Sequence, residues 1–335
     1  MVSITKMNKK QNILITGGSG YIGSCLSLYL KKKYEITNLD KKNNKHISIN
    51  ICDLLNLKKL SDILKKKKPK LIIHLAAQSL VDETINKEKY YQNNVMATKN
   101  LIIAMKNNNL TNLIFSSTAA VYKYSGKILN EKSLIKPKSN YAKTKLQCEK
   151  IIQNSKINSI ILRFFNVCSS LNINNKIVGE FHNPETHLIP TIVYKNLLKK
   201  KFFIYGKNYN TIDGTCIRDY VHISDICNAI DRSAIYLFKS HKKFQIINIG
   251  SSSRNTNMEI LQKIEKITKV KSLYNIVDRR KGDVDLLICS NTKAKKILNW
   301  EPQKSNMNTI IKDEIIWVKY LIKNHQKRTF KNYLK

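Results

Sequence analysis

Tyr141 and Lys145 are the side chains of this sequence best placed to move a proton. They occupy positions i and i+4 of a segment, 141–154, that predicts a helix, so both lie on one face of it. A free tyrosine has a pKa of about 10, and a base working near pH 7 needs this lowered by roughly 3 units, or about 4 kcal/mol. A neighbouring ammonium or another cation favours the ionised phenol. The spacing is also common by chance, and an ordinary exposed helix pair is the alternative interpretation.

Three hydroxyl side chains stand at the end of the strand predicted before that helix. They are Ser116, Ser117 and Thr118. A hydroxyl at a strand end can reach a substrate oxygen and pass its proton to Tyr141. We therefore expect Tyr141, Lys145 and Thr118 to form one catalytic group.

Gly17, Gly20 and Gly23 have the spacing G-x-x-G-x-x-G and join a predicted strand to a predicted helix. A turn this tight needs residues without Cβ, so that backbone amides can approach a pyrophosphate. The positive end of the following helix then faces that anion. The sequence therefore predicts a dinucleotide site, a turn without a ligand being the alternative.

Asp40 ends the next predicted strand, 17 residues past Gly23. A carboxylate there accepts hydrogen bonds from the adenosine ribose and repels a 2′-phosphate, which favours NAD over NADP. Lys41 and Lys42 follow it and could neutralise such a phosphate, so NADP stays open.

These residues are positioned by alternating strands and helices. Strands that are apolar throughout are typical of a parallel sheet covered on both faces, and their alternation with helices predicts an α/β, doubly wound (Rossmann) fold. The expected strands are 12–16, 34–40, 46–51, 70–75, 112–117, 159–164 and 245–249, and the expected helices are 21–33, 57–67, 91–107, 141–154 and 222–238.

The pattern changes near residue 167, where loops lengthen and prolines and glycines interrupt the periodicity. We expect residues 1–167 to form the NAD-binding domain, with later segments such as 222–250 returning to it. Residues 168–335 are expected to form mainly a smaller, discontinuous C-terminal lobe that binds substrate.

The chain has 335 residues and a formal net charge of +37, mostly from lysine. Such a charge could serve a nucleic acid or an anionic membrane. The lysines are scattered and not interleaved with aromatic residues, so we interpret them as a solvated surface and expect no nucleic-acid or membrane partner. Neither a run of about 18 apolar residues nor a signal peptide is evident, which favours a cytoplasmic protein. The 7 cysteines lack disulfide and zinc spacing, and no metal site is expected.

Motifs along nearly the whole chain resemble the extended short-chain dehydrogenase/reductase family. They are the glycine loop, Asp53-Leu54, His74 to Ala77, Asn94, Ser116 to Thr118 and the Tyr141/Lys145 pair. The second half is similar to the UDP-glucose 4-epimerases of that family, and Asp213-Gly-Thr-Cys-Ile-Arg-Asp-Tyr220 is the most specific part. Its further motifs are Leu162 to Asn166, His182 to Pro190, Ile204 to Gly206, Thr211 to His222 and Arg279 to Asp283.

The resemblance implies a redox-neutral reaction on a UDP-sugar. Tyr141 removes the proton of the sugar 4-hydroxyl with help from Thr118, C4 gives hydride to tightly held NAD, and the 4-keto sugar turns and takes it back on the other face. The implied cofactor-binding residues are Gly17, Gly20, Tyr21, Ile22, Gly23, Asp40, Asp53, Leu54, Leu75, Ala76, Ala77, Asn94, Ser116, Tyr141, Lys145 and Phe165. The implied substrate-binding residues are Thr118, Asn166, His187, Leu188, Phe203, Ile204, Tyr205, Arg218, Arg280, Asp283 and Leu287.

Two arginines suit a diphosphate because their planar donors bind bidentately. The alternative for Arg218 and Arg280 is a structural ion pair with Asp219 or Asp283.

A homodimer is implied by the resemblance alone.

Three positions depart from the family. Lys123 replaces a glycine after Val-Tyr, and Ser79 stands where some members have lysine. Leu287 stands where some members have a bulky tyrosine, so we hypothesise room for N-acetylated sugars.

Three rival functions remain. Ala119 and Ala120 follow Thr118 where similar 4,6-dehydratases carry Asp-Glu, which argues against a dehydratase. A 4-epimerase acting on UDP-GlcNAc, a UDP-uronate or a UDP-pentose stays open. A non-catalytic NAD-binding protein is disfavoured by the presence of Tyr141, Lys145 and Thr118.

Overall fold

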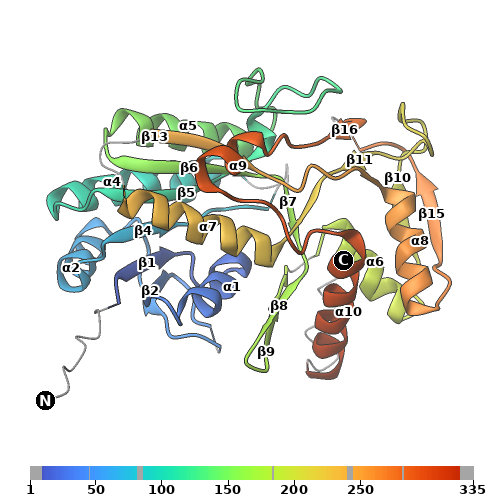
Figure 1. The fold of residues 1–335 in the computed structure, drawn as a ribbon, viewed down its shortest axis with the longest axis horizontal. Coiled ribbons are helices and arrows are strands. Elements are labelled where there is room, and N and C mark those ends of the chain that lie inside the picture. The colour runs from blue at the N-terminus through green and yellow to red at the C-terminus, as the bar shows by residue number, and fades with distance from the viewer. Residues whose placement is uncertain are drawn as a thin grey trace, which may run out of the picture.

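Seven parallel strands form the central sheet of the computed structural model (Figure 1). The structure describes residues 10–44, 46–80, 86–182, 185–239, 244–280 and 283–324. In spatial order the strands are β13 (Phe244–Ile249), β6 (Asn158–Phe164), β5 (Asn112–Thr118), β4 (Leu71–His74), β1 (Asn12–Thr16), β2 (Glu35–Asp40) and β3 (Asn50–Ile51). The order along the chain reverses between β1 and β4, which is where doubly wound folds bind their ligands.

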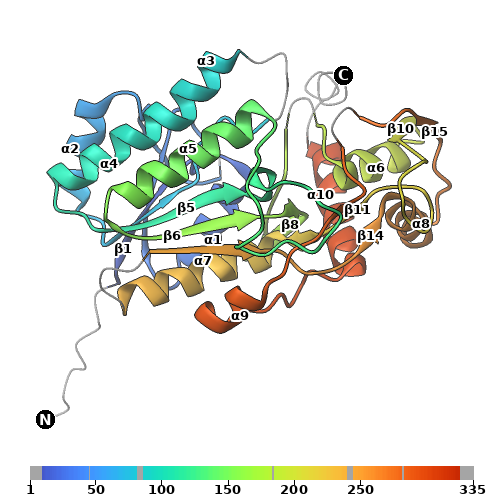
Figure 2. The same ribbon diagram turned by 90° about the horizontal axis from the view of Figure 1, so that it is seen from above.

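Helices cover both faces of the sheet (Figure 2). One face carries α2 (Leu57–Lys67), α3 (Lys87–Tyr90), the π-helical turn η1 (Tyr91–Met96), α4 (Ala97–Asn107) and α5 (Asn140–Asn154), and the other carries α1 (Tyr21–Leu30), α7 (Ile223–Phe238) and α9 (Thr292–Leu298). Strand β1 shows why both faces need cover. Ile13 and Ile15 are fully buried in one core cluster and Leu14 in the other, because successive side chains point to opposite faces. The predicted doubly wound α/β fold is confirmed.

Two predicted elements were too long. The helix expected over 21–33 ends at Leu30, whose carbonyl accepts hydrogen bonds from both Lys33 and Tyr34 in a tight turn. The strand expected over 46–51 is only β3, and the backbone nitrogen of His46 instead donates to the Asn44 side chain in a turn. Local side-chain hydrogen bonds of this kind compete with a sheet ladder.

A second group of elements packs beside the sheet. Its helices α6, α8 and α10 share a hydrophobic cluster that includes Ile192, Ile260 and Ile310, each fully buried. Its elements are β7 (Asn166–Cys168), β8 (Ser170–Ile173), β9 (Lys176–Gly179), α6 (Leu188–Leu197), β10 (Phe202–Tyr205), β11 (Ile217–Arg218), β12 (Tyr220–His222), β14 (Asn255–Thr256), α8 (Asn257–Thr268), β15 (Tyr274–Val277), β16 (Leu286–Leu287) and α10 (Met307–Asn324). The short turn η2 (Ala119–Val121) directly follows β5 of the central sheet.

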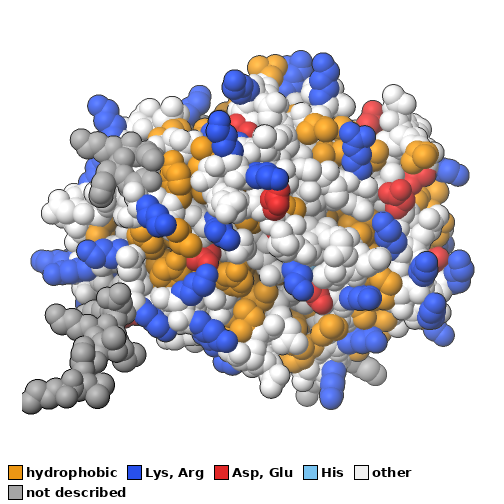
Figure 3. All heavy atoms as spheres, in the orientation of Figure 1, with side chains coloured by type: hydrophobic (Ala, Val, Ile, Leu, Met, Phe, Trp, Pro, Cys, Tyr) orange, Lys and Arg blue, Asp and Glu red, His pale blue; other side chains and the backbone are white. Residues whose placement is uncertain are grey.

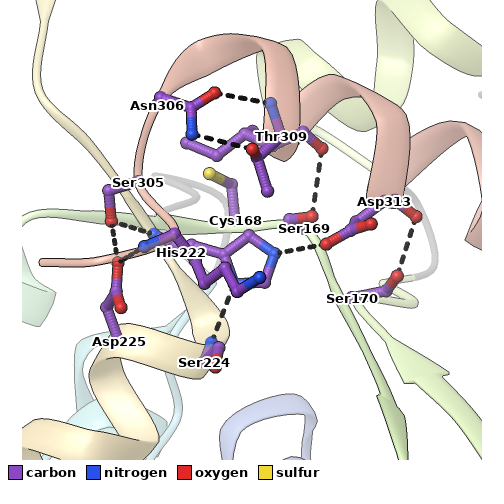
Figure 4. Close-up of polar contacts among 12 residues, drawn as sticks. Cys168, Ser169, Ser170, His222, Ser224, Asp225, Ser305, Asn306, Thr309 and Asp313 are labelled. Carbon is purple, nitrogen blue, oxygen red and sulfur yellow. Dashed lines mark hydrogen bonds and ion pairs between the residues drawn. The ribbon is translucent and has the colours of Figure 1, made fainter.

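A polar junction at the start of α7 fixes α10 to the rest of the molecule (Figure 4). His222 Nδ1 accepts a hydrogen bond from the Ser224 nitrogen, so Nε2 carries the proton and donates to Asp313 of α10 at 3.1 Å. Asp225 accepts from the hydroxyl of Ser305 and from two backbone nitrogens of the segment before α10. These bonds satisfy the buried polar groups where the two parts of the chain meet.

Lysine and arginine side chains are spread over the face shown in Figure 3, with apolar and acidic side chains between them. On this face they do not gather into one continuous basic stripe. In the ranges that the structure describes, none of the helices is both long and apolar enough to cross a membrane.

Candidate active site

The loop between β1 and α1 closes around two glycines that admit no side chain. Gly17 has φ +75°, and a Cβ there would lie 2.6 Å from the backbone nitrogen of Ala76. At Gly23 a Cβ would lie 2.1 Å from the carbonyl oxygen of Gly17. Both positions therefore need glycine whether or not a ligand binds to the loop.

Gly20 has a different environment. The nearest atom to a Cβ there would be the Gly17 oxygen, at 3.3 Å. Gly20 also caps α1 without a side-chain hydrogen bond, so the first N–H groups of the helix lack a capping side chain. This is the arrangement that accepts a pyrophosphate against the positive end of a helix.

Asp40 is fixed beside this loop at the end of β2. Its Oδ2 accepts from the Ser19 nitrogen and its Oδ1 from the Lys42 nitrogen, both at 3.0 Å. Lys41 donates its ammonium to Asn93 at 2.9 Å. The loop, the uncapped helix and the oriented carboxylate together fit NAD, with Asp40 available to the ribose hydroxyls.

Several other positions assigned to the cofactor lie at the carboxyl edge of the sheet. Leu75, Ala76 and Ala77 follow β4, Ser116 stands near the end of β5, and Phe165 follows β6. This edge is the ligand-binding edge of an open α/β sheet.

The other positions assigned to the cofactor differ in their contacts and burial. Asn94 accepts from the Gln78 nitrogen at 2.7 Å and donates to Thr144 at 3.0 Å, which ties the loop after β4 to α5. The Tyr21 hydroxyl donates to the Ser169 carbonyl at 2.5 Å. Ile22 and Leu54 pack into the core, whereas Asp53 is exposed.

Tyr141 and Thr118 lie near each other in the structure. The Tyr141 side chain, at the start of α5, is close enough to Thr118, at the end of β5, for Thr118 to lower the pKa of the phenol. The other two hydroxyls of the strand point elsewhere, because Ser116 donates to the His74 carbonyl at 3.2 Å and Ser117 to Glu149 at 2.5 Å. Thr118 is therefore the hydroxyl of this trio that accompanies Tyr141.

The pKa of Tyr141 differs from the sequence expectation. Burial raises it to about 12, and the neighbouring Thr118 lowers it less than burial raises it. A phenolate therefore needs a further positive charge close by, which the protein alone does not supply in sufficient strength.

Lys145 is almost fully buried one turn along α5. Its ammonium donates to the Ser116 carbonyl at 2.7 Å and lies 4.6 Å from the centre of the Phe115 ring. Burial lowers its pKa to about 8. Tyr141 and Lys145 are therefore not an ordinary exposed pair on a helix, which was the alternative interpretation of their spacing.

A buried ion pair beneath the site was missed by sequence reasoning. Arg163 of β6 lies 2.6 Å from Glu149 of α5, and it also donates to the Tyr122 hydroxyl at 2.9 Å. Glu149 in turn accepts the Ser117 hydroxyl. Its local signal was one arginine in the mostly apolar strand β6, which hydrophobic patterning overlooks.

Arg218 forms an ion pair with Asp283, which is the structural role expected as the alternative to binding a diphosphate. Its guanidinium bonds the Asp283 carboxylate and donates to the Val284 carbonyl at 2.8 Å. The Asp219 carboxylate, the other candidate partner, instead accepts three hydrogen bonds. They come from the backbone nitrogens of Ser251, Ser252 and Cys289. Asp283 therefore holds Arg218 in place.

Arg280 is held by stacking. Its guanidinium lies 4.1 Å from the centre of the Tyr205 ring of β10. In the same strand Ile204 is fully buried, whereas the Phe203 side chain is 53% exposed. Residues Asn183, Pro184, Lys281 and Gly282 of the matching motifs lie outside the described residues.

The other substrate positions lie on β7, β16 and the start of α6. Asn166 donates to the Asp219 carbonyl at 2.9 Å, and Leu287 pairs with Arg218 in the register of β16 and β11. His187 caps α6 and Leu188 begins it.

The segment between β9 and α6 holds a cluster that the sequence did not predict. Donor atoms of Glu180, His182, Glu185 and His187 all lie within 4.8 Å of one another. The available signal was the pattern Glu-x-His-x2-Glu-x-His, which lacks the cysteine pair of the common zinc motifs.

Known proteins resemble this chain over most of its length. A profile of the NAD dependent epimerase/dehydratase family matches residues 13–250. The UDP-glucose 4-epimerase of Rhizobium meliloti (strain 1021) is 34% identical over 309 residues, covering 88% of this chain and 93% of that relative. The UDP-glucose 4-epimerase of Lactobacillus helveticus is 34% identical over 322 residues, covering 92% and 97%.

A solved structure agrees with these sequence matches. UDP-glucose 4-epimerase from Brucella ovis in complex with NAD has a TM-score of 0.87 and 30% identity, and it covers 92% of this chain and 98% of that one. The resemblance seen in the sequence motifs is confirmed, and the chain belongs to the NAD-dependent epimerase/dehydratase family.

Proposed function

We propose that this protein is an NAD-dependent 4-epimerase that interconverts UDP-glucose and UDP-galactose through a transient 4-keto sugar. The observation that carries this proposal is the proximity of Tyr141 and Thr118 beside buried Lys145, at the edge where the glycine loop meets the sheet. Relatives named UDP-glucose 4-epimerase support the choice of reaction.

Tyr141 is the residue that exchanges the proton of the sugar 4-hydroxyl, with Thr118 bridging the two oxygens. When bound, NAD supplies a positively charged ring that takes hydrogen with its electron pair from sugar C4 and returns it to the opposite face. In this proposal the buried ammonium of Lys145 and the NAD ring together favour the ionised phenol and offset the burial that raises the pKa of Tyr141.

The smaller lobe holds the UDP. We assign the diphosphate to Arg218 and Arg280, because Asp283 and Tyr205 fix their planar donors in place. Further contacts come from Asn166, Phe203 and the start of α6 at His187 and Leu188. In this proposal the lobe comprises residues 168–335 apart from segments such as 222–250, and the protein works as a cytoplasmic homodimer without a nucleic-acid partner.

The decisive experiment incubates purified protein with UDP-galactose and no added NAD, and follows UDP-glucose. Activity without added cofactor indicates a retained NAD that is regenerated in each turnover. Tyr141→Phe is expected to abolish turnover, whereas Tyr274→Phe, a matched change in the lobe, retains it. An unchanged rate in Tyr141→Phe refutes the assignment of the base.

A second candidate activity is the 4-epimerisation of UDP-GlcNAc. Leu287 favours it, since a branched aliphatic side chain stands next to Arg218 where a bulky tyrosine would restrict the pocket. Wild type is expected to turn over both UDP-GlcNAc and UDP-glucose, and Leu287→Tyr to lose mainly the former. No detectable turnover of the acetylated sugar by wild type contradicts this candidate.

A further inference from the structure

Two carboxylates and two imidazoles converge on the segment that leads from β9 into α6. His187 Nδ1 lies 2.9 Å from Glu180 Oε1 and 3.1 Å from Glu185 Oε1. His182 Nδ1 lies 3.1 Å from that same Glu180 oxygen and 3.7 Å from Glu185 Oε2. One carboxylate oxygen thus faces two imidazole nitrogens.

These separations match the edges of a metal coordination tetrahedron. With bonds of about 2.0–2.2 Å from zinc to nitrogen or oxygen, neighbouring ligand atoms lie roughly 3.3–3.6 Å apart. The nitrogen–oxygen distances of 2.9 to 3.7 Å, measured to either oxygen of Glu185, lie around that range, and donor atoms of the four residues lie within 4.8 Å of one another. Imidazole nitrogens and carboxylate oxygens are ligands that suit zinc and similar transition-metal ions.

Buried acidic oxygens around the cluster lack partners. Glu180 is 2% exposed and its Oε2 has no hydrogen-bond partner among the described residues. Glu314 of α10 is fully buried, and neither of its carboxyl oxygens has such a partner in the same set. The charges of Glu180 and Glu185 act on Glu314, so a third acidic group lies near the cluster. A buried carboxylate without a partner carries a large free-energy cost, and a bound cation would remove it.

The two imidazole rings are 5.2 Å apart and face the same pair of carboxylates. A divalent ion bound to two neutral imidazoles and two carboxylates is electrically balanced.

We propose that Glu180, His182, Glu185 and His187 bind one divalent transition-metal ion, with zinc preferred. The ion clamps the segment before α6, and Glu185 already orders its backbone by accepting from the nitrogens of Thr186 and His187, each at 2.9 Å. This site departs from the sequence expectation of no metal. It does not depend on the proposed epimerase activity.

The test uses the full chain, freed of any histidine tag, with metal content and thermal stability as readouts. Wild type is expected to carry about one zinc per chain, to melt at a lower temperature after treatment with a chelator, and to recover when zinc is added back. Cobalt added to the stripped protein should give the visible absorption of a four-coordinate ion. Magnesium should produce neither effect, because it prefers octahedral oxygen ligands.

The double variant His182→Gln/Glu185→Gln is expected to lose zinc and to bind added zinc at least about tenfold more weakly. His46→Gln, which removes an imidazole elsewhere, retains the metal. Equal zinc binding by wild type and the double variant overturns the site. If the double variant does not fold, metal binding by the chelator-treated wild type tests the site. Failure of that protein to bind zinc or cobalt shows that the four side chains form an ion-pair network without a metal.

Discussion

The ammonium of Lys145 donates to the main-chain carbonyl of Ser116 at 2.7 Å, which joins α5 to β5 inside the catalytic edge. Lys145 is only 2% exposed, so its position is set by the fold and not by solvent. A buried cation is expensive before a cofactor and substrate arrive, and this cost gives the first prediction.

Lys145→Met is expected to stabilise the protein at pH 7 while it removes most activity. Burial lowers the pKa of Lys145 from 10.5 to about 8, so between these values the unfolded chain binds more protons than the folded one. Stability from this group therefore rises with pH across that window, and the full cost applies below it. We expect a gain of about 1–3 kcal/mol at pH 7, after the lost hydrogen bond is subtracted.

Denaturant unfolding at pH 7 and at pH values within that window measures this effect. Lys143→Met, an exposed lysine of the same helix, is the control and should change neither stability nor its pH dependence. A Lys145→Met variant that is less stable than wild type at pH 7 would contradict the interpretation.

Gly20 and Gly23 are expected to respond differently to alanine. A Cβ at Gly23 would meet the Gly17 oxygen at 2.1 Å, so Gly23→Ala should lower stability by roughly 3 kcal/mol or more. At Gly20 the closest contact is 3.3 Å, so Gly20→Ala should fold but retain NAD at least about tenfold less tightly. Thermal melting and the NAD content of purified protein separate the two effects. If Gly20→Ala keeps its NAD, the loop does not approach the pyrophosphate there.

Asp40→Asn is expected to weaken NAD binding and to admit NADP. The amide loses the charge that repels a 2′-phosphate, and it accepts less strongly from the ribose. We expect the preference for NAD over NADP to fall by about tenfold, as measured by binding to cofactor-free protein. Asp62→Asn, an exposed carboxylate on α2, serves as the control. An unchanged preference would assign cofactor selection to another residue.

Arg280→Gln is expected to raise KM for the UDP-sugar about tenfold with little change in kcat. Its guanidinium is stacked on Tyr205 and is assigned to the diphosphate, away from the reacting carbon. Loss of a uniform binding contact changes KM, whereas loss of a transition-state contact changes kcat. Inhibition by UDP should weaken in parallel. Arg232→Gln on the exposed side of α7 should leave both constants unchanged, and a selective loss of kcat in Arg280→Gln would reassign this arginine.

The sequence by itself determined the features whose causes are local. Gly23 had to be a glycine because a Cβ there would meet the Gly17 oxygen of the same turn, and the pattern of apolar runs determined the alternation of strands and helices. Tyr141 and Lys145 share a helix face because of their spacing. The family motifs then implied which positions to examine.

Tertiary structure decided what depends on neighbours distant in the chain. Arg218 and Asp283 are 65 residues apart, so nothing local could select that partner over the adjacent Asp219. The pKa of Tyr141 rises to about 12 because burial is a property of the packed molecule, whereas the sequence suggested only the cation that would lower it. Likewise, Glu314 comes from α10 to the cluster around Glu180, since only packing brings together side chains from separate elements. Local chemistry named the reactive groups, and long-range packing set their charges and partners.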